Sequence, residues 1–197
     1  MRLLCVGAFF CAGCIPVIGA QDDRATCDRA FDRPFASGGR LSIDVRSGDI
    51  EVVGANREAV RVTCELKDGD PHEVNIRFRR DGSFGDLSIH GGPNNDVRLR
   101  IEVPKQSGLT LRTPAGDLNV SGIAGDKDIS MHAGDLTISV GNPRDYRSAE
   151  ASVFAGDLAA SAFGVTKDGL FRSFSLTNTD GKYKLRAHVG AGDLVLQ

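Results

Sequence analysis

The sequence has 197 residues, which is enough for one ordinary domain with a sizeable core. Its 24 lysine and arginine residues nearly balance 26 acidic residues, so the charge gives no case for a protein that binds nucleic acid or an anionic membrane. The high glycine content and the absence of tryptophan suit a β-rich protein with many tight turns.

Residues 1–20 have the pattern of a signal peptide. Met1 and Arg2 form a minimal positive region, an apolar or small stretch follows from Leu3 to Val17, and Ile18-Gly19-Ala20 offers a cleavage site. The apolar run is too short for a permanent transmembrane helix, and no later segment is apolar enough to be one. The alternative is a buried N-terminal helix. We expect an exported protein of the periplasm or the cell surface, with no transmembrane span.

A second processing route is open at Cys14. The segment Phe10-Cys11-Ala12-Gly13-Cys14 resembles the lipoprotein signal of bacteria, in which a cysteine after two small residues is lipidated and becomes the new N-terminus. Cys11 departs from that signal, which prefers leucine at this position. Cleavage after Ala20 and lipidation of Cys14, which would anchor the chain to the outer membrane, therefore both stay open.

Either route leaves Cys27 and Cys64 as the unmodified cysteine pair. Two cysteines in an exported chain favour one disulfide, because the compartment is oxidising. The alternative is that Cys64 is a small buried residue, since it shares one face of an alternating segment with Val60 and Val62.

Residues 21–39 show no clear pattern, and we expect an irregular lead-in to a single domain over residues 40–197. From Arg40 onward apolar and polar residues alternate with a period of two, which is typical of strands with one buried face. The turn-rich segment 67–72 separates the alternating stretches 60–66 and 74–80. This arrangement predicts an antiparallel hairpin in the N-terminal half.

Five copies of one tetrapeptide interrupt the alternation. Each consists of a small residue, glycine, aspartate, and leucine or isoleucine, and a looser sixth copy is Phe84-Gly85-Asp86-Leu87. The glycines of the last four copies are 18, 22 and 36 residues apart, and 36 equals two steps of 18. A period near twenty residues is typical of stacked supersecondary units. The five close copies are Ser47-Gly48-Asp49-Ile50, Ala115-Gly116-Asp117-Leu118, Ala133-Gly134-Asp135-Leu136, Ala155-Gly156-Asp157-Leu158 and Ala191-Gly192-Asp193-Leu194.

Each copy shifts the parity of the alternation. An inward small residue such as Ala133 is followed three positions later by an inward residue such as Leu136, which a straight strand cannot do. Glycine supplies the backbone freedom for a bend, and aspartate can hydrogen-bond the local backbone. We therefore expect an all-β fold, a β-solenoid or parallel β-helix-like stack of short strands. Its structural corners would be Gly48-Asp49, Gly116-Asp117, Gly134-Asp135, Gly156-Asp157 and Gly192-Asp193.

These units resemble a large family of exported bacterial proteins described only as candidate adhesins, whose members carry repeated Ser/Ala-Gly-Asp-Ile/Leu units. The likeness covers about residues 40–197 and includes Gly169–Phe174 and Gly181–Tyr183. The resemblance implies a β-solenoid-like domain and offers no catalytic residues. It says little about function, because function does not follow from fold.

The five corner aspartates could also stack as a row of calcium ligands. Calcium requires six to eight oxygens, however, and one aspartate per corner supplies too few, so we expect turn-forming aspartates. The histidines lack the paired spacing of metal ligands, and no Gly-x-Ser-x-Gly elbow is present. We expect no metal, no cofactor and no enzyme. The histidines are His72, His90, His132 and His188.

Several arginines project from the outward faces of the expected strands and could form a basic strip for an anionic glycan or an acidic partner; the alternative is an ordinary solvated face. They are Arg77, Arg79, Arg80, Arg98 and Arg100. The final residues Leu194–Gln197 would end the stack on an uncovered strand, which predicts a contact surface at the C-terminal strand for self-association or for a partner in the envelope.

Together these features favour a non-catalytic, adhesin-like interaction module of the cell envelope, with an envelope protein or a surface glycan as its partner. Two alternatives stay open: a glycan-active β-helix enzyme, and a lipid-anchored scaffolding protein of the envelope.

Overall fold

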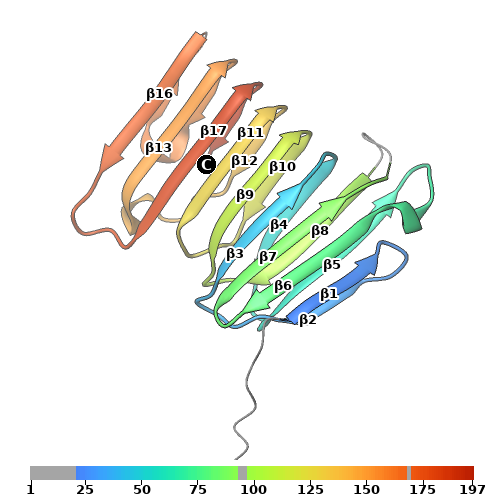
Figure 1. Cartoon of the computed structure of the whole chain (residues 1–197). Coiled ribbons are helices and arrows are strands. Elements are labelled where there is room, and N and C mark those ends of the chain that lie inside the picture. Colours follow the sequence, from blue (N-terminus) through green and yellow to red (C-terminus); the bar gives the residue numbers. More distant parts are fainter. Residues whose placement is uncertain (1–20, 93–96, 168–169) are drawn as a thin grey trace, which may run out of the picture.

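Two nine-stranded β-sheets pack face to face in the computed structural model, which describes residues 21–92, 97–167 and 170–197 (Figure 1). The inward side chains of both sheets form one apolar core. The expected signal peptide and Cys14 lie outside the described residues. Within the described ranges, no helix is long and apolar enough to cross a membrane.

Sheet A contains, in spatial order, β1 (Gln21–Thr26), β6 (Asn75–Asp81), β7 (Phe84–His90), β3 (Arg40–Val45), β9 (Gly108–Ala115), β11 (Lys127–Ala133), β17 (Tyr183–Ala191), β13 (Tyr146–Ala155) and β16 (Leu170–Thr177). Sheet B contains β15 (Val165–Lys167), β14 (Leu158–Ala160), β18 (Leu194–Leu196), β12 (Leu136–Ile138), β10 (Asp117–Ser121), β4 (Asp49–Ala55), β8 (Val97–Pro104), β5 (Ala59–Leu66) and β2 (Phe31–Pro34). Short 3-10 helices connect some of them: η1 (Pro71–Glu73), η2 (Pro143–Asp145) and η3 (Ser161–Phe163).

The centre of the molecule is the expected stack of coils, and the predicted all-β solenoid-like fold is confirmed. In each coil a strand of sheet A turns a corner and continues as a strand of sheet B: β3–β4, β9–β10, β11–β12, β13–β14 and β17–β18. Neighbouring coils pair in parallel and in register, so that Ala133 lies opposite Ala115 on one side and Ala191 on the other. Copies of the same tetrapeptide therefore stack on one another.

The spatial order of the coils differs from their order in the sequence. The last coil, β17–β18, lies between β11–β12 and β13–β14 (Figure 1). The expectation of an uncovered C-terminal strand is therefore wrong, because β18 pairs with β12 on one side and β14 on the other. Leu194 and Leu196 are fully buried.

The spacing of 36 residues between the last two copies does not represent two coils. The chain between β14 and β17 instead forms η3, β15 and β16, which close the C-terminal end of the stack. Both strands pair antiparallel, β15 with β14 and β16 with β13. The inward Phe174 of β16 lies opposite Ala151, and its ring centre is 5.2 Å from that of Phe163 in η3.

Antiparallel pairing in the N-terminal half is confirmed, but the expected partners are wrong. The segments 60–66 and 74–80 lie in different sheets, since β5 pairs with β2 and β8 whereas β6 pairs with β1 and β7. The hairpin is β6–β7, joined by Gly82 and Ser83. The turn-rich segment 67–72 instead belongs to the connection, residues 67–74, that carries the chain from one sheet to the other.

Residues 21–39 are not the irregular lead-in that the sequence suggested, because they contain the edge strands β1 and β2. β1 lacks alternating apolar residues since its polar side chains lie at the surface and pair with arginines; Asp22, for example, lies 2.6 Å from Arg77. After it, Phe31 and Phe35 enter the core, where both rings pack edge-on against Phe78.

Candidate functional site: the corner ladder and the groove on sheet A

The five Gly-Asp corners lie in one row, in the order Gly48, Gly116, Gly134, Gly192 and Gly156. All five glycines have φ between +112° and +136°, a region that side chains of L-residues rarely adopt. A Cβ atom on Gly192 would overlap the carbonyl oxygen of Gly134, and one on Gly134 would overlap that of Gly116. Glycine is thus required at the corners both by backbone conformation and by the close approach of the next coil.

The corner aspartates connect neighbouring coils. The Oδ1 atom of Asp135 accepts a hydrogen bond from the backbone N–H of Asp193 at 3.0 Å, and Oδ1 of Asp193 accepts one from the N–H of Asp157 at the same distance. A longer bond of 3.4 Å joins Asp117 Oδ1 to the N–H of Asp135. The sequence suggested that each aspartate holds its own corner, whereas these bonds reach the neighbouring corner. We call this row the corner ladder. Asp49, at its end, lies 3.7 Å from Arg98.

The looser sixth copy is not a corner. Gly85 and Asp86 lie inside β7, which pairs in parallel with β3. A Cβ atom on Gly85 would come within about 3 Å of the rings of Phe35 and Phe78. This glycine therefore makes room for the aromatic cluster.

Cys27 and Cys64 are joined by a disulfide in the structure, with their Cα atoms 5.5 Å apart. Cys27 follows β1 of sheet A, and Cys64 lies in β5 of sheet B. The bond therefore ties the first strand of one sheet to the other sheet.

The arginines do not form one basic strip, because Arg77 and Arg79 face outward from sheet A whereas Arg98 and Arg100 belong to sheet B. Most are also paired with carboxylates: Arg77 with Asp22, Arg79 with Asp86, Arg98 with Asp49 and Arg100 with Glu51. Arg80 donates to the carbonyl of Pro34 at 2.8 Å. Of the two interpretations of these arginines, the basic strip is therefore wrong, and the ordinary solvated face fits the structure.

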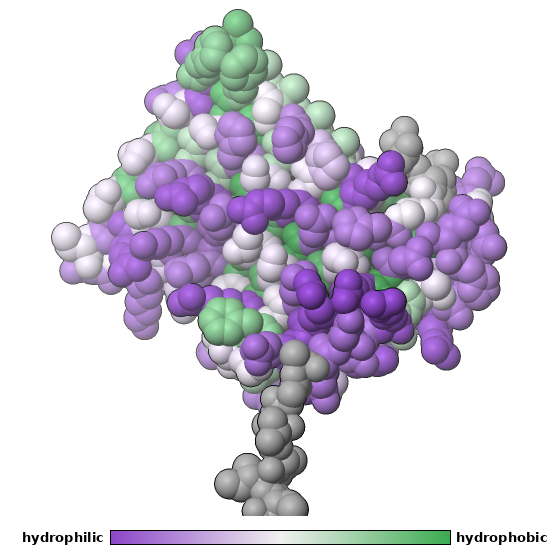
Figure 2. Space-filling model, viewed as in Figure 1, coloured by the Kyte–Doolittle hydropathy of each residue, from purple (hydrophilic) through white to green (hydrophobic). Residues whose placement is uncertain are grey.

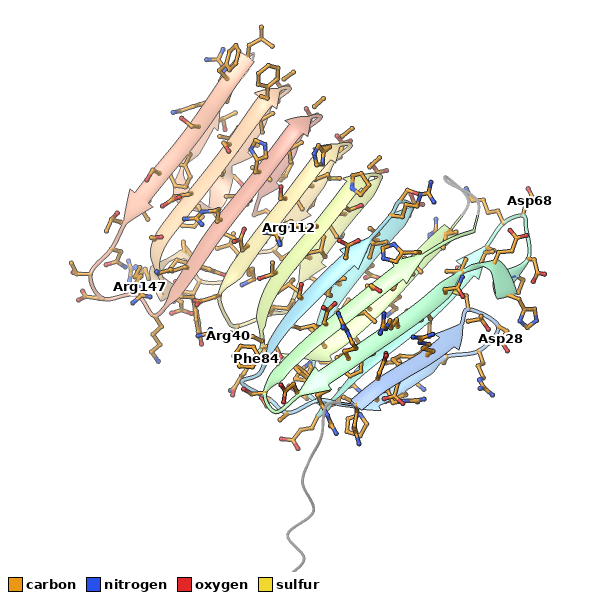
Figure 3. The ribbon with its side chains drawn as sticks, viewed as in Figure 1. Asp28, Arg40, Asp68, Phe84, Arg112 and Arg147 are labelled. Atoms are coloured by element: carbon orange, nitrogen blue, oxygen red, sulfur yellow. A yellow bond between two sulfur atoms is a disulfide. The ribbon has the colours of Figure 1, made fainter. Side chains whose placement is uncertain are left out.

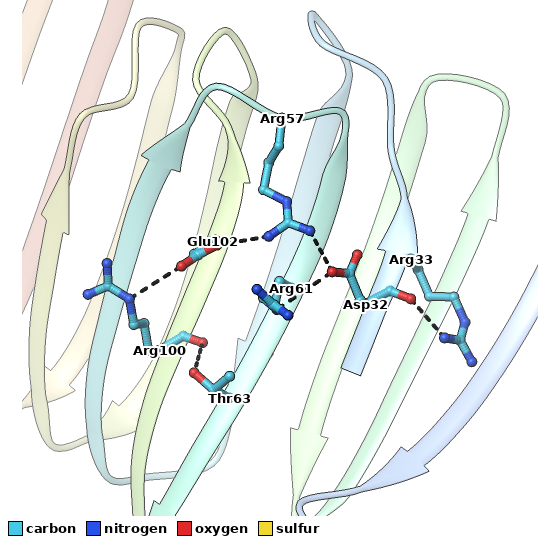
Figure 4. A network of polar contacts seen from close by, with 7 residues as sticks. All are labelled: Asp32, Arg33, Arg57, Arg61, Thr63, Arg100 and Glu102. Carbon is cyan, nitrogen blue, oxygen red and sulfur yellow. Dashed lines mark hydrogen bonds and ion pairs between the residues drawn. The ribbon is translucent and has the colours of Figure 1, made fainter. Parts of the chain in front are cut away.

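A polar network on the outer face of sheet B continues this pairing (Figure 4). Arg57 lies between two carboxylates, with its Nη1 3.0 Å from Glu102 and its Nη2 2.5 Å from Asp32. Arg61 and Arg100 approach the same carboxylates at 3.6 and 3.5 Å. Because the network connects β2, β5 and β8, its charges hold the N-terminal strands of sheet B together.

An open groove of about 950 Å³ crosses sheet A where strands β3, β9, β11 and β17 begin. Phe84 borders it with 58% of its surface exposed, and the Arg40 guanidinium lies 5.9 Å from the centre of that ring. Figure 3 shows the two side chains next to each other at the lower end of the sheet, and in Figure 2 the same end carries an apolar spot among hydrophilic residues.

The groove carries charges of both signs. Arg186 lies 3.4 Å from Glu150, and the backbone N–H of Lys184 donates to Asp126 at 2.8 Å. Within the part of the chain that the structure describes, the side chains of Arg40, Lys182 and Lys184 form no ion pair with a carboxylate. The groove therefore carries three cationic side chains that no carboxylate of the described residues neutralises.

A buried lysine lies beneath the groove. Lys127 is 2% exposed, and its Nζ donates to the hydroxyl of Tyr146 at 2.6 Å and to the carbonyl of Gly125 at 3.2 Å. Burial lowers the pKa of Lys127 to about 8, although the nearby Asp126 opposes the shift. Burial raises the pKa of Tyr146 to about 12. The inward position of Lys127 could have been predicted from the sequence, because Lys127 has the same parity as the inward Ile129 and Met131.

The described histidines do not gather. His72 lies in η1, His90 ends β7, and His132 and His188 lie in β11 and β17. Across residues 21–92, 97–167 and 170–197, no three His, Cys, Asp or Glu side chains could hold a metal ion together. His188 Nδ1 lies 2.9 Å from Ser152 Oγ on the outer face of sheet A. In the described residues His188 has no carboxylate partner, so this pair lacks the acid of a nucleophilic triad.

No family model and no curated protein matches this sequence. Among solved structures, a candidate cell adhesion protein from Clostridium sporogenes ATCC 15579 is 12% identical with a TM-score of 0.54, over 90% of this chain and 99% of that one. A candidate adhesin from Bacteroides fragilis NCTC 9343 is 8% identical with a TM-score of 0.30, over 86% and 98% of the two chains. The second similarity is too low to carry an argument. The first shows that this chain has the fold of the Clostridium protein, as the resemblance of its repeats to candidate adhesins implied.

Proposed function

We propose that this protein is an exported, non-catalytic, adhesin-like module that binds an anionic surface glycan in the groove on sheet A. The observation that carries the proposal is the pairing of an exposed aromatic ring, Phe84, with cationic side chains that have no acidic partner in the described residues. Apolar rings offer a flat surface for the C–H face of a sugar. Ammonium and guanidinium groups recognise carboxylate, sulfate or phosphate groups on a glycan.

The arrangement of the groove also favours an extended ligand. Parallel strands place equivalent outward residues about 4.8 Å apart, so the groove offers a regular row of side chains across the sheet. Ser42, Thr110, Asp128, Arg186 and Glu150 occupy one such row in register. A linear polymer crossing the strands would meet several of these groups at once.

Two further observations support the location and the class of function. A disulfide between Cys27 and Cys64 suits an oxidising compartment outside the cytoplasm. The structure with the same fold is described as a cell adhesion protein, and adhesion at the envelope is consistent with a rigid solenoid that presents long, flat polar faces.

Binding to defined polysaccharides tests the proposal. Isothermal titration calorimetry should show that the purified processed protein binds polygalacturonate or alginate and that neutral dextran binds much more weakly. Phe84→Ala and Lys184→Ala should each weaken binding about tenfold, and added salt should weaken it further. Phe154→Ala is the matched control, because Phe154 is an exposed phenylalanine outside the groove, on β13. Equal binding of all variants, or no preference for anionic polymers, would contradict the proposal.

A second function, hydrolysis of a glycan, is favoured by one specific observation. Asp128 and Glu150 project from the same row of the groove, on either side of Arg186. Pairs of carboxylates separated across a sugar are the catalytic groups of most glycosidases. Incubation with the same polymers and measurement of new reducing ends separates the two functions. If the wild type produces new reducing ends and Asp128→Asn and Glu150→Gln do not, the protein is an enzyme. Binding of the polymer without new reducing ends supports an adhesin.

We further propose that the mature chain begins at Gln21, after removal of residues 1–20. Mass spectrometry of the protein expressed with its own signal should give this N-terminus. A diacylglycerol-modified Cys14 would instead favour the lipid-anchored scaffold.

A further inference from the structure

One of the four sheet edges differs from the others. In β1, Asp22 and Asp23 pair with Arg77 and Arg33, and such charges discourage contact with another strand. β2 contains Pro34, and β15 has only three residues. β16, the other edge of sheet A, has eight residues and a single charged side chain, Arg172. It is thus a long edge strand with little charge of its own. Lys167 of β15 reaches it, and the Lys167 Nζ donates to the backbone carbonyl of Ser173 at 2.6 Å.

The same edge carries the main exposed apolar surface. Leu170 and Phe171 of β16 are 61% and 71% exposed, and Leu176 is 36% exposed. Phe154 of the neighbouring β13 is 54% exposed, and its ring centre lies 4.6 Å from that of Phe171. Figure 2 shows an apolar cap at the upper end of β13 and β16, whereas Leu176 lies at the other end of β16. Monomeric proteins rarely leave apolar residues gathered on an exposed edge strand.

Phe171 also has an unusual backbone. Its φ is +55°, and it is the one non-glycine residue with positive φ in the described ranges. A phenylalanine in this region is strained, and such strain tends to persist where a function requires the side chain in that position. Here the strained backbone holds the ring on the exposed patch against Phe154.

The sequence of β16 is complementary to itself. Leu170-Phe171-Arg172-Ser173-Phe174-Ser175-Leu176 has an exposed leucine at each end and a serine at its centre. If two copies pair antiparallel about Ser173, each Leu170 lies opposite the other copy's Leu176, and each Arg172 lies opposite Phe174. Opposed residues then share a face of the sheet, as a twofold axis perpendicular to it requires. The arrangement opposes the leucines to each other, Arg172 to the aromatic ring of Phe174 and Phe171 to Ser175, with no like charges directly opposite.

We propose that β16 is a homodimerisation edge, at which a second copy of this chain pairs antiparallel and continues sheet A into one sheet through both subunits. The partner is a second copy because β16 exposes apolar residues, carries a single charged side chain and opposes no like charges when it pairs with itself. The other three edges are charged, interrupted by proline or short. The groove lies where the parallel strands of sheet A begin, whereas Phe171 lies beside the end of β13. A dimer through β16 would therefore present two copies of the groove.

Sedimentation velocity over a range of protein concentrations tests the proposal. The wild-type protein should form a dimer, and Phe171→Lys should weaken association at least tenfold, because lysine on an edge strand opposes pairing. Phe84→Lys is the matched control, since Phe84 is also an exposed phenylalanine on sheet A, and its dimer should be unchanged. The circular dichroism spectrum of Phe171→Lys, and its affinity for polygalacturonate or alginate, should equal those of the wild type.

A cysteine variant tests the register independently of any loss of folding. Ser173→Cys should give a disulfide-linked dimer on oxidation, because the two copies of residue 173 face each other across the axis. Ser175→Cys, which would face Phe171, should cross-link much less. A wild-type chain that stays monomeric at all soluble concentrations, a dimer that persists in Phe171→Lys, or failure of Ser173→Cys to cross-link would each overturn the proposal.

Discussion

Asp135 and Asp193 are 58 residues apart in the sequence, yet Oδ1 of Asp135 accepts a hydrogen bond from the backbone N–H of Asp193 at 3.0 Å. The bond joins the corner after β11 to the corner after β17, two strands that are neighbours only because the last coil is inserted out of order. The backbone N–H of Leu136 donates to the carbonyl of Asp193 at the same corner. The corner ladder therefore adds a side-chain bond to the backbone bonds that hold the inserted coil.

Removing this acceptor should lower stability modestly. Asp135→Ala should reduce the free energy of unfolding by about 1 kcal/mol, the typical net value of one hydrogen bond. Asp135→Asn should lose less, because its amide oxygen can accept the same bond. Urea unfolding of both variants measures the difference. Asp68→Ala is the control, since Asp68 lies in the exposed loop after β5 (Figure 3) and should leave stability unchanged; an equal loss there would contradict a role for the ladder.

The combined cost of close packing and unusual φ at a corner can be compared with that of a left-handed glycine in open space by two alanine substitutions. Gly141 has φ of +75° with open space around it, so Gly141→Ala should cost only the backbone strain, about 1 kcal/mol. Gly192 has φ of +129°, and a Cβ atom there meets the carbonyl of Gly134. Gly192→Ala should therefore cost about 3 kcal/mol or more, because the coils must move apart. Equal melting temperatures of the two variants would show that the corner has no special requirement for glycine.

The corners could be predicted from sequence, whereas the order of the coils could not. A shift of parity at each Ala-Gly-Asp-Leu unit requires a bend whatever the neighbours are, so local pattern sufficed. The order depends on which copies stack, and Ala133, Ala155 and Ala191 offer the same small residue and the same glycine to any neighbour. The sequence therefore permits several orders. The end strands β15 and β16, which lack corners, mark where the stack closes beyond β13–β14.

The groove could not be predicted from the sequence, for a related physical reason. Its residues come from segments far apart in sequence, and the inserted β17 brings Lys184 and Arg186 between β11 and β13. The sequence could not exclude an arginine strip, because outward position can be read from alternation whereas the sheet to which a strand belongs cannot. The carboxylate partners of these arginines come from other strands, such as Asp22 of β1 for Arg77.

The disulfide should contribute substantially to stability. Cys27 and Cys64 are 37 residues apart, and closing a loop of this length should stabilise the folded state by about 4 kcal/mol in the chain-entropy model. Non-reducing mass spectrometry should show the chain two hydrogen atoms lighter than after reduction. Urea unfolding with and without a reductant, compared with the Cys27→Ala/Cys64→Ala variant, measures the contribution. If a reductant lowers the free energy of unfolding of the double variant as much as that of the wild type, the disulfide is not the cause of the effect.

Lys127 should make the protein more stable as the pH rises from about 8 to about 10. Burial lowers the pKa of Lys127 in the folded state to about 8, from an ordinary value of 10.5. Between these values the unfolded chain binds more protons than the folded chain, so the free energy of unfolding increases with pH. Tyr146 has the opposite effect above pH 10, because burial raises its pKa from 10.0 to about 12 and the unfolded chain loses that proton first. The contribution of this pair should therefore be greatest near pH 10.

Replacement of the buried charge tests this pH dependence. Lys127→Met keeps an unbranched apolar chain and removes the ammonium group, so it should abolish the rise in stability between pH 8 and pH 10. Below pH 8 the variant should be more stable than the wild type by roughly 2–3 kcal/mol, since the cost of burying the charge disappears. Urea unfolding from pH 7 to pH 10 measures both effects, and Lys184→Met, at an exposed position of β17, should keep the wild-type slope. Parallel pH profiles for the wild type and Lys127→Met would show that the ammonium group of Lys127 is not buried in solution.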